Sequence, residues 1–272
     1  MVSHVGLSMS LKVSIAGATG WTGKAVAQAV AVAEDMTLAS AVSRSTAGQV
    51  LRGIGVASDI KMCGSVAEAL ATPVDVFVDY AGSSTVREHV MMALQKGVNV
   101  VVGSSGLTGD DFVEIERLAK EKNLGVIACG NFSITAGLAK HFSLLAAKFL
   151  PSWEIIDYAS ATKLDAPSGT TRELAEAMDK VRQNKLGRPV SEVTGDRTAR
   201  GAQISGTPVH SLRLPGYSLS FETQFGLPDE RLTIRHDAGS SAAPYVDGTL
   251  LAIRKASETK GVIRGLDQLM FG

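Results

Sequence analysis

The chain has 272 residues, of which 45% are hydrophobic, 20% charged and 5% aromatic. This composition is typical of a soluble globular protein with one large domain or two modest ones. The 27 basic and 27 acidic residues give a formal net charge of zero, so no global field favours nucleic acid or an anionic membrane as a partner. No uncharged apolar run is long enough to span a bilayer, and we expect neither a membrane protein nor a nucleic-acid-binding protein.

The two cysteines, Cys63 and Cys129, are far apart and have no metal-ligand spacing, and the five histidines have none either. We therefore expect no metal site, and the cysteines favour buried thiols in a reducing cytoplasm. Residues 1–10 lack the basic start and the long apolar core of a signal peptide, and a second methionine, Met9, precedes the first predicted strand. We interpret residues 1–10 as a frayed or alternative start of a cytoplasmic protein.

The first half of the chain alternates between short apolar runs and longer segments with apolar residues at helical spacing. Predicted strands cover residues 12–16, 36–42, 74–80, 98–102 and 125–129, and predicted helices cover residues 23–33, 84–96 and 110–122. This alternation predicts an α/β domain with a parallel sheet, helices on both faces and right-handed crossovers.

The pattern changes near Asn131. Predicted helices at 135–149 and 171–184 flank a predicted strand at 154–161, and strand-like runs follow at 209–214, 219–226 and 231–236. The runs are joined by short turns containing Gly or Pro, which favours an antiparallel or mixed sheet, and residues 187–203 form a predicted loop. A last helix at 245–257 could return to the first domain. We expect residues 1–132 and 240–272 to form a Rossmann-type domain and residues 133–239 an inserted α+β domain.

A glycine-rich turn stands directly between the first predicted strand and the first predicted helix. Its sequence is Gly17-Ala18-Thr19-Gly20-Trp21-Thr22-Gly23, with the spacing G-x-x-G-x-x-G. Glycines at such a position permit a tight turn and close approach to a pyrophosphate, which the helix N-terminus attracts. A plain strand-turn-helix connection is the alternative, but the placement after the first strand favours a dinucleotide-binding turn.

The end of the second predicted strand bears on the choice of cofactor. A carboxylate there would bind the ribose 2′-hydroxyl of NAD, but the chain has Ser43-Arg44-Ser45. One guanidinium and two hydroxyls are suited to a 2′-phosphate. The sequence therefore predicts NADPH, with NADH possible, although Arg44 as a plain surface charge is the alternative.

The densest motif is Lys163-Leu164-Asp165-Ala166-Pro167-Ser168-Gly169-Thr170. Thr170 and Glu173 have the spacing of a capping box, which predicts a helix start. The backbone N–H groups of residues 168–170 would then form a cradle for a carboxylate or phosphate, and Lys163 would add a cation or a proton. From these residues alone, a capped helix with an exposed lysine is an equally good interpretation.

This motif resembles the signature of the 4-hydroxy-tetrahydrodipicolinate (dihydrodipicolinate) reductases. The likeness continues in Gly103-Ser104-Ser105-Gly106, which resembles the Gly-Thr-Thr-Gly loop of that family, and in Asn131-Phe132-Ser133, which matches its Asn-Phe-Ser segment. Residues 209–213 resemble a strand seen in many members. Because these motifs and the glycine-rich turn occur in the family's order, the resemblance covers most of the chain.

The resemblance implies a homotetramer in which a Rossmann domain binds NAD(P)H and the inserted domain binds substrate and forms the subunit contacts. It implies hydride transfer to a cyclic imine or enamine carboxylic acid of the lysine and diaminopimelate pathway. Lys163 would be the proton donor, and the substrate-binding residues would be Ser160, Lys163, Ser168, Gly169 and Thr170. The implied cofactor-binding residues are Gly17, Ala18, Thr19, Gly20, Trp21, Thr22, Ser43, Arg44, Gly103, Ser104, Ser105, Cys129, Gly130, Asn131 and Phe132.

The chain departs from the family pattern at two places. Family members carry adjacent histidines four and three residues before the lysine, where this chain has Ala159 and Ser160, and Trp21 replaces a usual arginine. Loss of a general acid typically costs roughly 10²–10⁴-fold in rate. A diverged reductase of another imine, enamine or carbonyl acid is therefore one alternative. A non-catalytic NADPH-binding sensor is another, which the retained Lys163 disfavours.

Overall fold

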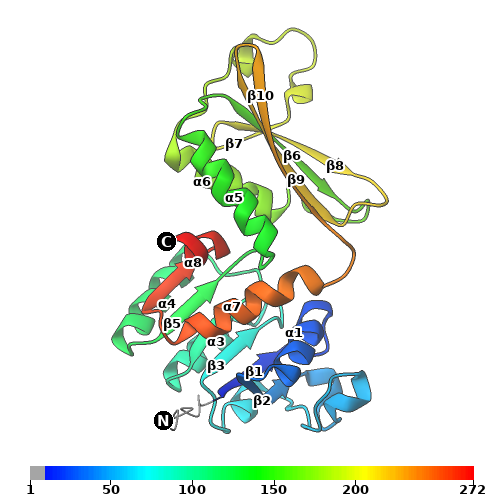
Figure 1. Ribbon diagram of the computed structural model, residues 1–272, viewed down its shortest axis with the longest axis vertical. Helices are drawn as coiled ribbons and strands as arrows, with labels where there is room; N and C mark the ends of the chain where they lie inside the picture. The colour runs from blue at the N-terminus through cyan, green and yellow to red at the C-terminus, as the bar shows by residue number, and fades with distance from the viewer. Residues whose placement is uncertain (1–9) are drawn as a thin grey trace, which may run out of the picture. The chain divides into compact units, whose positions relative to one another are not determined.

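The computed structural model describes residues 10–272, which form two compact units (Figure 1). Unit 1 consists of the chain up to Ser133 and of Ala242–Gly272, and unit 2 is Ile134–Ser241. The boundaries expected from the sequence differ from this division by one or two residues, and the functions assigned to the two parts stay predictions. The interpretation of residues 1–10 as a frayed start falls, except for Ser10, outside the described residues.

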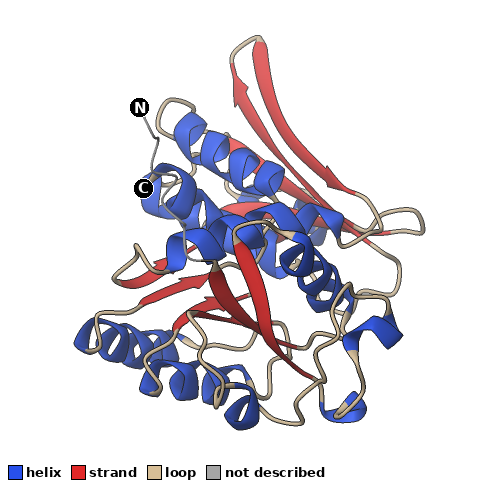
Figure 2. Cartoon of the chain, turned by 60° about the horizontal axis from the view of Figure 1, so that its bottom comes forward, coloured by secondary structure: helices blue, strands red, loops and turns tan. Residues whose placement is uncertain are grey.

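Unit 1 contains a six-stranded sheet with helices on both faces (Figure 2). The strands run in the order β11-β5-β4-β3-β1-β2, and all neighbours pair in parallel. They are β1 (Leu11–Ala16), β2 (Met36–Val42), β3 (Val76–Asp79), β4 (Asn99–Val102), β5 (Gly125–Ala128) and β11 (Gly261–Arg264). The chain passes from β1 outward to β2 and then crosses to β3 on the other side of β1. The carboxyl ends of these strands therefore form a topological switch point, where open α/β sheets bind ligands.

The helices of unit 1 bury both faces of this sheet. They are α1 (Trp21–Val32), α2 (Val66–Ala69), α3 (Val86–Gln95), α4 (Gly109–Glu121), α7 (Val246–Ala256) and α8 (Leu266–Phe271). Helices α1 and α7 pack on each other and on the sheet, whereas α2, α3 and α4 share a second apolar core with it. Because both faces are covered, strand β3 is fully buried, as a continuous apolar run predicts. Strand β11, which pairs with β5, was not predicted.

Unit 2 contains a five-stranded mixed sheet with the order β10-β9-β6-β8-β7. Strands β6 and β8 pair in parallel and the other neighbours are antiparallel. The elements are α5 (Ile134–Ala147), β6 (Trp153–Ala159), α6 (Gly169–Val181), β7 (Ala202–Ile204), β8 (Thr207–Arg213), β9 (Leu219–Leu227) and β10 (Glu230–Ala238). Helices α5 and α6 lie side by side along the sheet (Figure 1) and bury aromatic side chains such as Trp153 and Phe221 beneath them.

Alternation along β6 places one charged side chain among apolar ones. Trp153, Ile155, Asp157 and Ala159 occupy alternate positions on the face that α5 and α6 cover, and all four are buried. Asp157 is therefore a carboxylate among buried apolar side chains of β6. Its hydrogen-bond partners determine the local structure at the start of α6.

The predicted capping box at Thr170 and Glu173 is wrong. Helix α6 begins at Gly169 with Ser168 as its N-cap, and the Ser168 side chain makes no capping hydrogen bond. Glu173 pairs instead with Lys140 of α5 at 2.6 Å. The physical reason is Asp157, because it attracts the hydroxyl of Ser168 away from the helix end. A capping box does form at Thr108 and Asp111, where α4 begins.

The predicted loop at residues 187–203 contains short regular pieces. Two 3₁₀ turns, Val190–Glu192 and Arg197–Arg200, interrupt it, and its last two residues begin strand β7. The preceding helix α6 ends at Val181, three residues earlier than the sequence pattern predicts. None of the predicted site residues lies in these segments.

Candidate functional site

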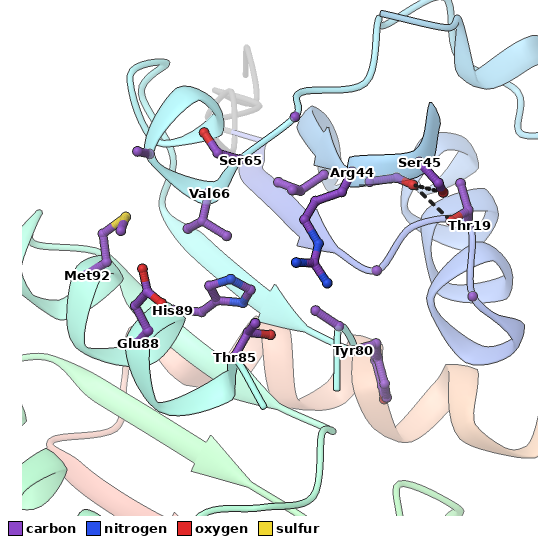
Figure 3. Close-up of a pocket in the computed structure, with 17 residues that line it drawn as sticks. Thr19, Arg44, Ser45, Ser65, Val66, Tyr80, Thr85, Glu88, His89 and Met92 are labelled. Carbon is purple, nitrogen blue, oxygen red and sulfur yellow. Dashed lines mark hydrogen bonds between the residues drawn. The ribbon is translucent and has the colours of Figure 1, made fainter. Parts of the chain in front are cut away.

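A pocket of about 550 Å³ lies in unit 1 at the carboxyl ends of β1, β2 and β3 (Figure 3). It therefore occupies the switch point of the sheet. Its lining combines the glycine-rich turn, the segment after β2 and the first turn of α3. The lining residues are Gly17, Thr19, Gly20, Val42, Ser43, Arg44, Ser45, Gly64, Ser65, Val66, Ala67, Tyr80, Ala81, Thr85, Glu88, His89 and Met92.

The glycine-rich turn is closed so tightly that side chains would not fit at two of its positions. Gly17 has a φ of +78°, and a Cβ there would lie 2.4 Å from the Tyr80 carbonyl oxygen. A Cβ at Gly23 would lie 2.1 Å from the Gly17 carbonyl oxygen. Helix α1 starts directly after Gly20 with no side-chain cap and no acidic residue in its first turn. Its positive end is therefore left for an anion, as a bound pyrophosphate requires.

The segment after β2 brings hydroxyls and a guanidinium to the same pocket. The Ser43 hydroxyl is buried and lies 3.1 Å from that of Thr19 and 3.4 Å from that of Ser45. Arg44 is exposed, and its side chain extends into the pocket (Figure 3). Within residues 10–272 the Arg44 guanidinium has no hydrogen bond or ion pair, so it is available to a phosphate group.

A buried carboxylate organises another wall of the pocket. Asp79, at the end of β3, is fully buried, and its Oδ2 lies 2.7 Å from Nδ1 of His89 on α3. Its Oδ1 accepts hydrogen bonds from the Ser104 hydroxyl at 2.5 Å and from the Ala81 N–H at 3.1 Å. The Asp79 carbonyl oxygen also accepts the N–H groups of Gly103 and Ser104. Asp79 therefore forms hydrogen bonds with α3 and with the loops that follow β3 and β4.

The structure gathers some of the predicted cofactor-binding residues around the pocket and leaves others outside its lining. Gly17, Thr19, Gly20, Ser43 and Arg44 line it. The predicted residues outside the lining are Ala18, Trp21, Thr22, Gly103, Ser104, Ser105, Cys129, Gly130, Asn131 and Phe132. The Trp21 ring is exposed and packs edge-on against Tyr245, 5.6 Å between centroids. Ser104 still acts on the pocket through its hydrogen bond to Asp79.

Sequence reasoning missed several lining residues, above all Tyr80, Thr85, Glu88 and His89. A signal for Tyr80 was present, because it directly follows a buried strand, and ligands of open α/β sheets bind at that end. For Glu88 and His89 there was no such signal. The packing of α3 against the sheet determines which of its side chains line the pocket, and sequence spacing does not show this.

The second candidate region is the loop between β6 and α6 in unit 2, which holds Lys163. The ammonium of Lys163 pairs with Asp165 Oδ1 at 2.6 Å, and its side chain is about one-third exposed at 31%. The hydrogen bond from Lys163 holds the pKa of the Asp165 carboxyl below its usual range. Lys163 is therefore a partly accessible side chain whose ammonium is paired with a carboxylate.

The start of α6 differs from the predicted cradle at one residue. Ser168 donates both its N–H, at 3.0 Å, and its hydroxyl to Asp157, so neither group is free. Gly169 is exposed and Thr170 is half-buried. The N–H groups of Gly169 and Thr170 have no hydrogen-bond partner in the part of the chain that the structure describes. Two of the three predicted cradle donors are therefore open.

Asp157 receives hydrogen bonds from two elements. Besides Ser168, it accepts Thr171 Oγ1 at 3.0 Å on α6 and Ser211 Oγ at 3.2 Å and Arg213 Nη2 at 2.8 Å on β8. Burial raises the pKa of the Asp157 carboxyl, but the hydrogen bonds from Ser168, Arg213 and Thr171 outweigh burial and hold that pKa below its ordinary value. Asp157 is therefore ionised at neutral pH.

The two positions that carry histidines in the resembling family have no ionisable side chain here. Ala159 is fully buried at the end of β6. The Ser160 hydroxyl lies 3.3 Å from that of Thr162, and the Ser160 carbonyl accepts the N–H of Lys163. Between residues 158 and 170 the ionisable groups are Lys163 and Asp165.

Two features that would indicate other functions are absent from residues 10–272. These residues contain no group of three or more His, Cys, Asp or Glu side chains arranged to hold a metal ion. No helix among them is both long and apolar enough to cross a membrane.

Both units match models of one protein family. Residues 11–132 match the N-terminal region of dihydrodipicolinate reductase, and residues 133–270 match its C-terminal region. The chain belongs to the dihydrodipicolinate reductase family. The 4-hydroxy-tetrahydrodipicolinate reductases of Mycobacterium sp. (strain KMS) and Geobacillus kaustophilus (strain HTA426) are each 34% identical to the reductase over 96% of its length, and 99% and 100% of their own chains are covered.

A solved structure of the family shows the same fold. The dipicolinate-bound dihydrodipicolinate reductase of Paenisporosarcina sp. TG-14 has a TM-score of 0.82 and 32% sequence identity, with 95% of this chain and 99% of that chain covered. The family resemblance and the predicted fold class are confirmed: the reductase has a Rossmann-type domain with a parallel sheet and a second domain with a mixed sheet. It is an oxidoreductase whose first domain is of the kind that binds NAD(P)H, and the comparisons do not favour the diverged or sensor alternatives.

Proposed function

We propose that this reductase uses NADPH to reduce the cyclic imine or enamine dicarboxylic acid that forms when 4-hydroxy-tetrahydrodipicolinate loses water, in the lysine and diaminopimelate pathway. The observation that carries the proposal is the pocket of unit 1, where a tight glycine turn, an uncapped helix and Arg44 converge. NADPH, when bound, supplies a hydride to the substrate ring.

The residues of the pocket fit a dinucleotide with a 2′-phosphate. Gly17 and Gly20 line the pocket without side chains, so the backbone of the turn and the start of α1 are accessible to the pyrophosphate. Arg44, with the hydroxyls of Ser43 and Ser45, would hold the 2′-phosphate. The one carboxylate among the lining residues, Glu88, comes from α3 and not from the end of β2, where NAD-binding carboxylates stand. These features support NADPH over NADH.

The start of α6 fits a carboxylate of the substrate. The N–H groups of Gly169 and Thr170 are unpaired within residues 10–272 and lie at the positive end of a 13-residue helix. The reductase of Paenisporosarcina sp. TG-14 was solved with dipicolinate, a planar dicarboxylate. We assign one substrate carboxylate to Gly169 and Thr170, and we assign Ser168 to the support of these residues, since its donors are taken by Asp157.

Lys163 is the residue of this loop that can deliver a proton, because Ala159 and Ser160 provide no acid near neutral pH. Its ammonium is partly exposed and forms an ion pair with Asp165. In the proposed reaction, Lys163 gives its proton to the substrate as the hydride is added, and solvent restores it. A cytoplasmic location and a homotetramer, both implied by family membership, belong to the same proposal.

The test is a steady-state assay with both cofactors and with 4-hydroxy-tetrahydrodipicolinate generated in situ. We expect NADPH oxidation that depends on the acid, with a kcat in the range of about 1–10³ s⁻¹, and a higher kcat/KM with NADPH than with NADH. Tight NADPH binding without oxidation by this acid would contradict the proposal. Oxidation by a different imine or keto acid alone would show that the active site has diverged at Ala159 and Ser160.

A further inference from the structure

The buried carboxylate of Asp157 is connected to both parts of the proposed substrate site. It lies on β6 and is fully buried. Its hydrogen-bond donors come from Ser168 and Thr171 at the start of α6 and from Ser211 and Arg213 at the end of β8. A buried, ionised carboxylate needs such donors, and removing the charged one leaves an uncompensated charge in the core.

The first connection leads to the start of α6. A serine at an N-cap ordinarily accepts a hydrogen bond from the second or third N–H of its helix. An ionised carboxylate can only accept, so the Ser168 hydroxyl donates to Asp157. The hydroxyl oxygen accepts no capping hydrogen bond from the N–H groups of the helix. Thr171 Oγ1, in the first turn of the helix, also donates to Asp157. The helix is therefore anchored from below while its N–H groups at Gly169 and Thr170 are left open.

The second connection leads to Lys163. Nη2 of Arg213 donates to Asp157 Oδ2 at 2.8 Å and to the Asp165 carbonyl at 2.6 Å, and Nη1 donates to the Leu212 carbonyl at 2.8 Å. The side chain of Asp165 in turn pairs with Lys163 at 2.6 Å. The guanidinium thus fixes the middle of the loop between β6 and α6, and its 16% side-chain exposure leaves it little freedom to adopt another arrangement.

We infer that Asp157 and Arg213 are positioning residues whose buried ion pair holds Lys163 and the open start of α6 in one fixed arrangement. The inference deepens the proposed function and rests on it. It also explains how an anionic substrate is tolerated beside a buried negative charge, because the guanidinium of Arg213 offsets the charge of Asp157 at 2.8 Å. Neither residue needs to touch the substrate.

The experiment compares Arg213→Met, which removes the charge and the hydrogen bonds, with Arg213→Lys, which keeps a cation able to donate to Asp157 and Asp165. Binding of dipicolinate is measured by calorimetry and binding of NADPH by fluorescence, with folding of each variant checked by circular dichroism. We expect Arg213→Met to weaken dipicolinate binding roughly 10–100-fold, the range that the loss of one hydrogen bond to a charged group gives. NADPH binding should not change, and Arg213→Lys should recover most of the lost dipicolinate affinity.

Hydrogen exchange supplies a readout that does not depend on any ligand. In Arg213→Met, amides of residues 160–170 should exchange faster than in the parent, with the rest of β6 unchanged. The matched control is Arg200→Met, because Arg200 pairs with Glu154 on the opposite face of the same strand. The control should retain parental dipicolinate binding and parental exchange. If Arg213→Met does not fold, Arg213→Gln is measured in the same way.

The outcomes separate the inference from the proposed function. Parental dipicolinate affinity together with parental exchange in Arg213→Met overturns the inference and leaves the proposed function standing. If the parent protein binds no dipicolinate and oxidises no NADPH with the acid, the proposed function fails. In that case, the hydrogen exchange of residues 160–170 in Arg213→Met is the only remaining test of the positioning role.

Discussion

Lys163 carries the proposed proton transfer without the neighbouring histidines of its family. Its ammonium pairs with the Asp165 side chain at 2.6 Å, and the carbonyl of Asp165 accepts a hydrogen bond from Arg213. The structure shows no other ionisable group between residues 158 and 170. The activity of this reductase should therefore depend on Lys163 more strongly than if a second acid stood beside it.

Replacing Lys163 with alanine should lower kcat by about 10²–10⁴-fold, the usual contribution of a positioned general acid. NADPH binding should be unchanged because the pocket of unit 1 contains no residue of this loop. Lys180→Ala is the matched control, since Lys180 is an exposed lysine in the last turn of the adjacent helix α6. Steady-state rates and NADPH titrations measure both effects. A Lys163→Ala enzyme with the parental kcat would show that another group donates the proton.

Replacing Arg44 with alanine should reduce kcat/KM for NADPH by roughly 10–100-fold, since a hydrogen bond to a charged group contributes about 1.5–3 kcal/mol. The value for NADH should change little, because NADH lacks the 2′-phosphate that Arg44 is assigned to hold. Arg52→Ala is the control, as Arg52 pairs with Asp59 and does not line the pocket. An equal loss of kcat/KM for both cofactors would indicate that Arg44 contacts a group that NADH and NADPH have in common, and not the 2′-phosphate.

Among the elements, the connection between β1 and α1 is the one whose local geometry is most restrictive. Gly17 adopts a positive φ against the end of β3, and Gly23 lets the first turn of α1 approach Gly17. The turn thereby holds the helix end and the pocket wall in contact with each other. A small change in this connection should affect cofactor binding before it affects the rest of the fold.

Gly23→Ala should therefore weaken NADPH binding at least tenfold and destabilise the protein by about 1–3 kcal/mol, the usual cost of overpacking. The added Cβ would lie 2.1 Å from the Gly17 carbonyl oxygen, so the turn or the helix must move. Gly53→Ala is the control, since a Cβ at Gly53 meets nothing within 4 Å. Fluorescence titration and urea unfolding give the two quantities. Parental NADPH affinity in Gly23→Ala would contradict the assigned role of the turn.

How far the elements could be predicted depends on whether their partners are local. Strand β3 and the glycine turn were predicted because a buried apolar run and a strand-turn-helix spacing are visible in a few consecutive residues. Strand β11 is only four residues long, and its partner β5 lies more than 130 positions earlier, so no local pattern marks it. For the same reason the Asp157–Arg213 pair was missed, since its members are 56 positions apart. That pair, and not a capping box, determines how α6 begins.

For the molecule as a whole, the buried ion pair of unit 2 makes stability depend on pH. The pKa of Asp157 is lower in the folded protein than in the unfolded chain, where an aspartate titrates near about 3.9. The folded state therefore binds fewer protons. The stability contributed by Asp157 is fully present above that unfolded pKa and is lost as the pH falls through the folded pKa.

Asp157→Asn should lower the free energy of unfolding by about 3–5 kcal/mol at pH 7, because it leaves Arg213 largely buried and without its counter-charge. The difference from the parent protein should shrink as the pH falls below about 4, because Asp157 of the unfolded parent chain takes up a proton there before the folded protein does. Asp59→Asn, which removes an exposed partner of Arg52, should differ little from the parent at either pH. Urea unfolding at pH 7 and pH 3 measures the difference. A gap that stays constant or widens toward acid would contradict the ionised state of Asp157.

The transfer of a hydride from the cofactor to the cyclic acid can be followed with a deuterium label. The reductase is supplied with NADPH carrying deuterium at both hydrogen positions of the nicotinamide C4 and with 4-hydroxy-tetrahydrodipicolinate made in situ, and the product is examined by mass spectrometry. We expect one deuterium in each product molecule from the parent enzyme and from Lys180→Ala, and almost no product from Lys163→Ala. Product without deuterium, or NADPH oxidation that proceeds equally without the acid, would contradict reduction of this substrate by direct hydride transfer.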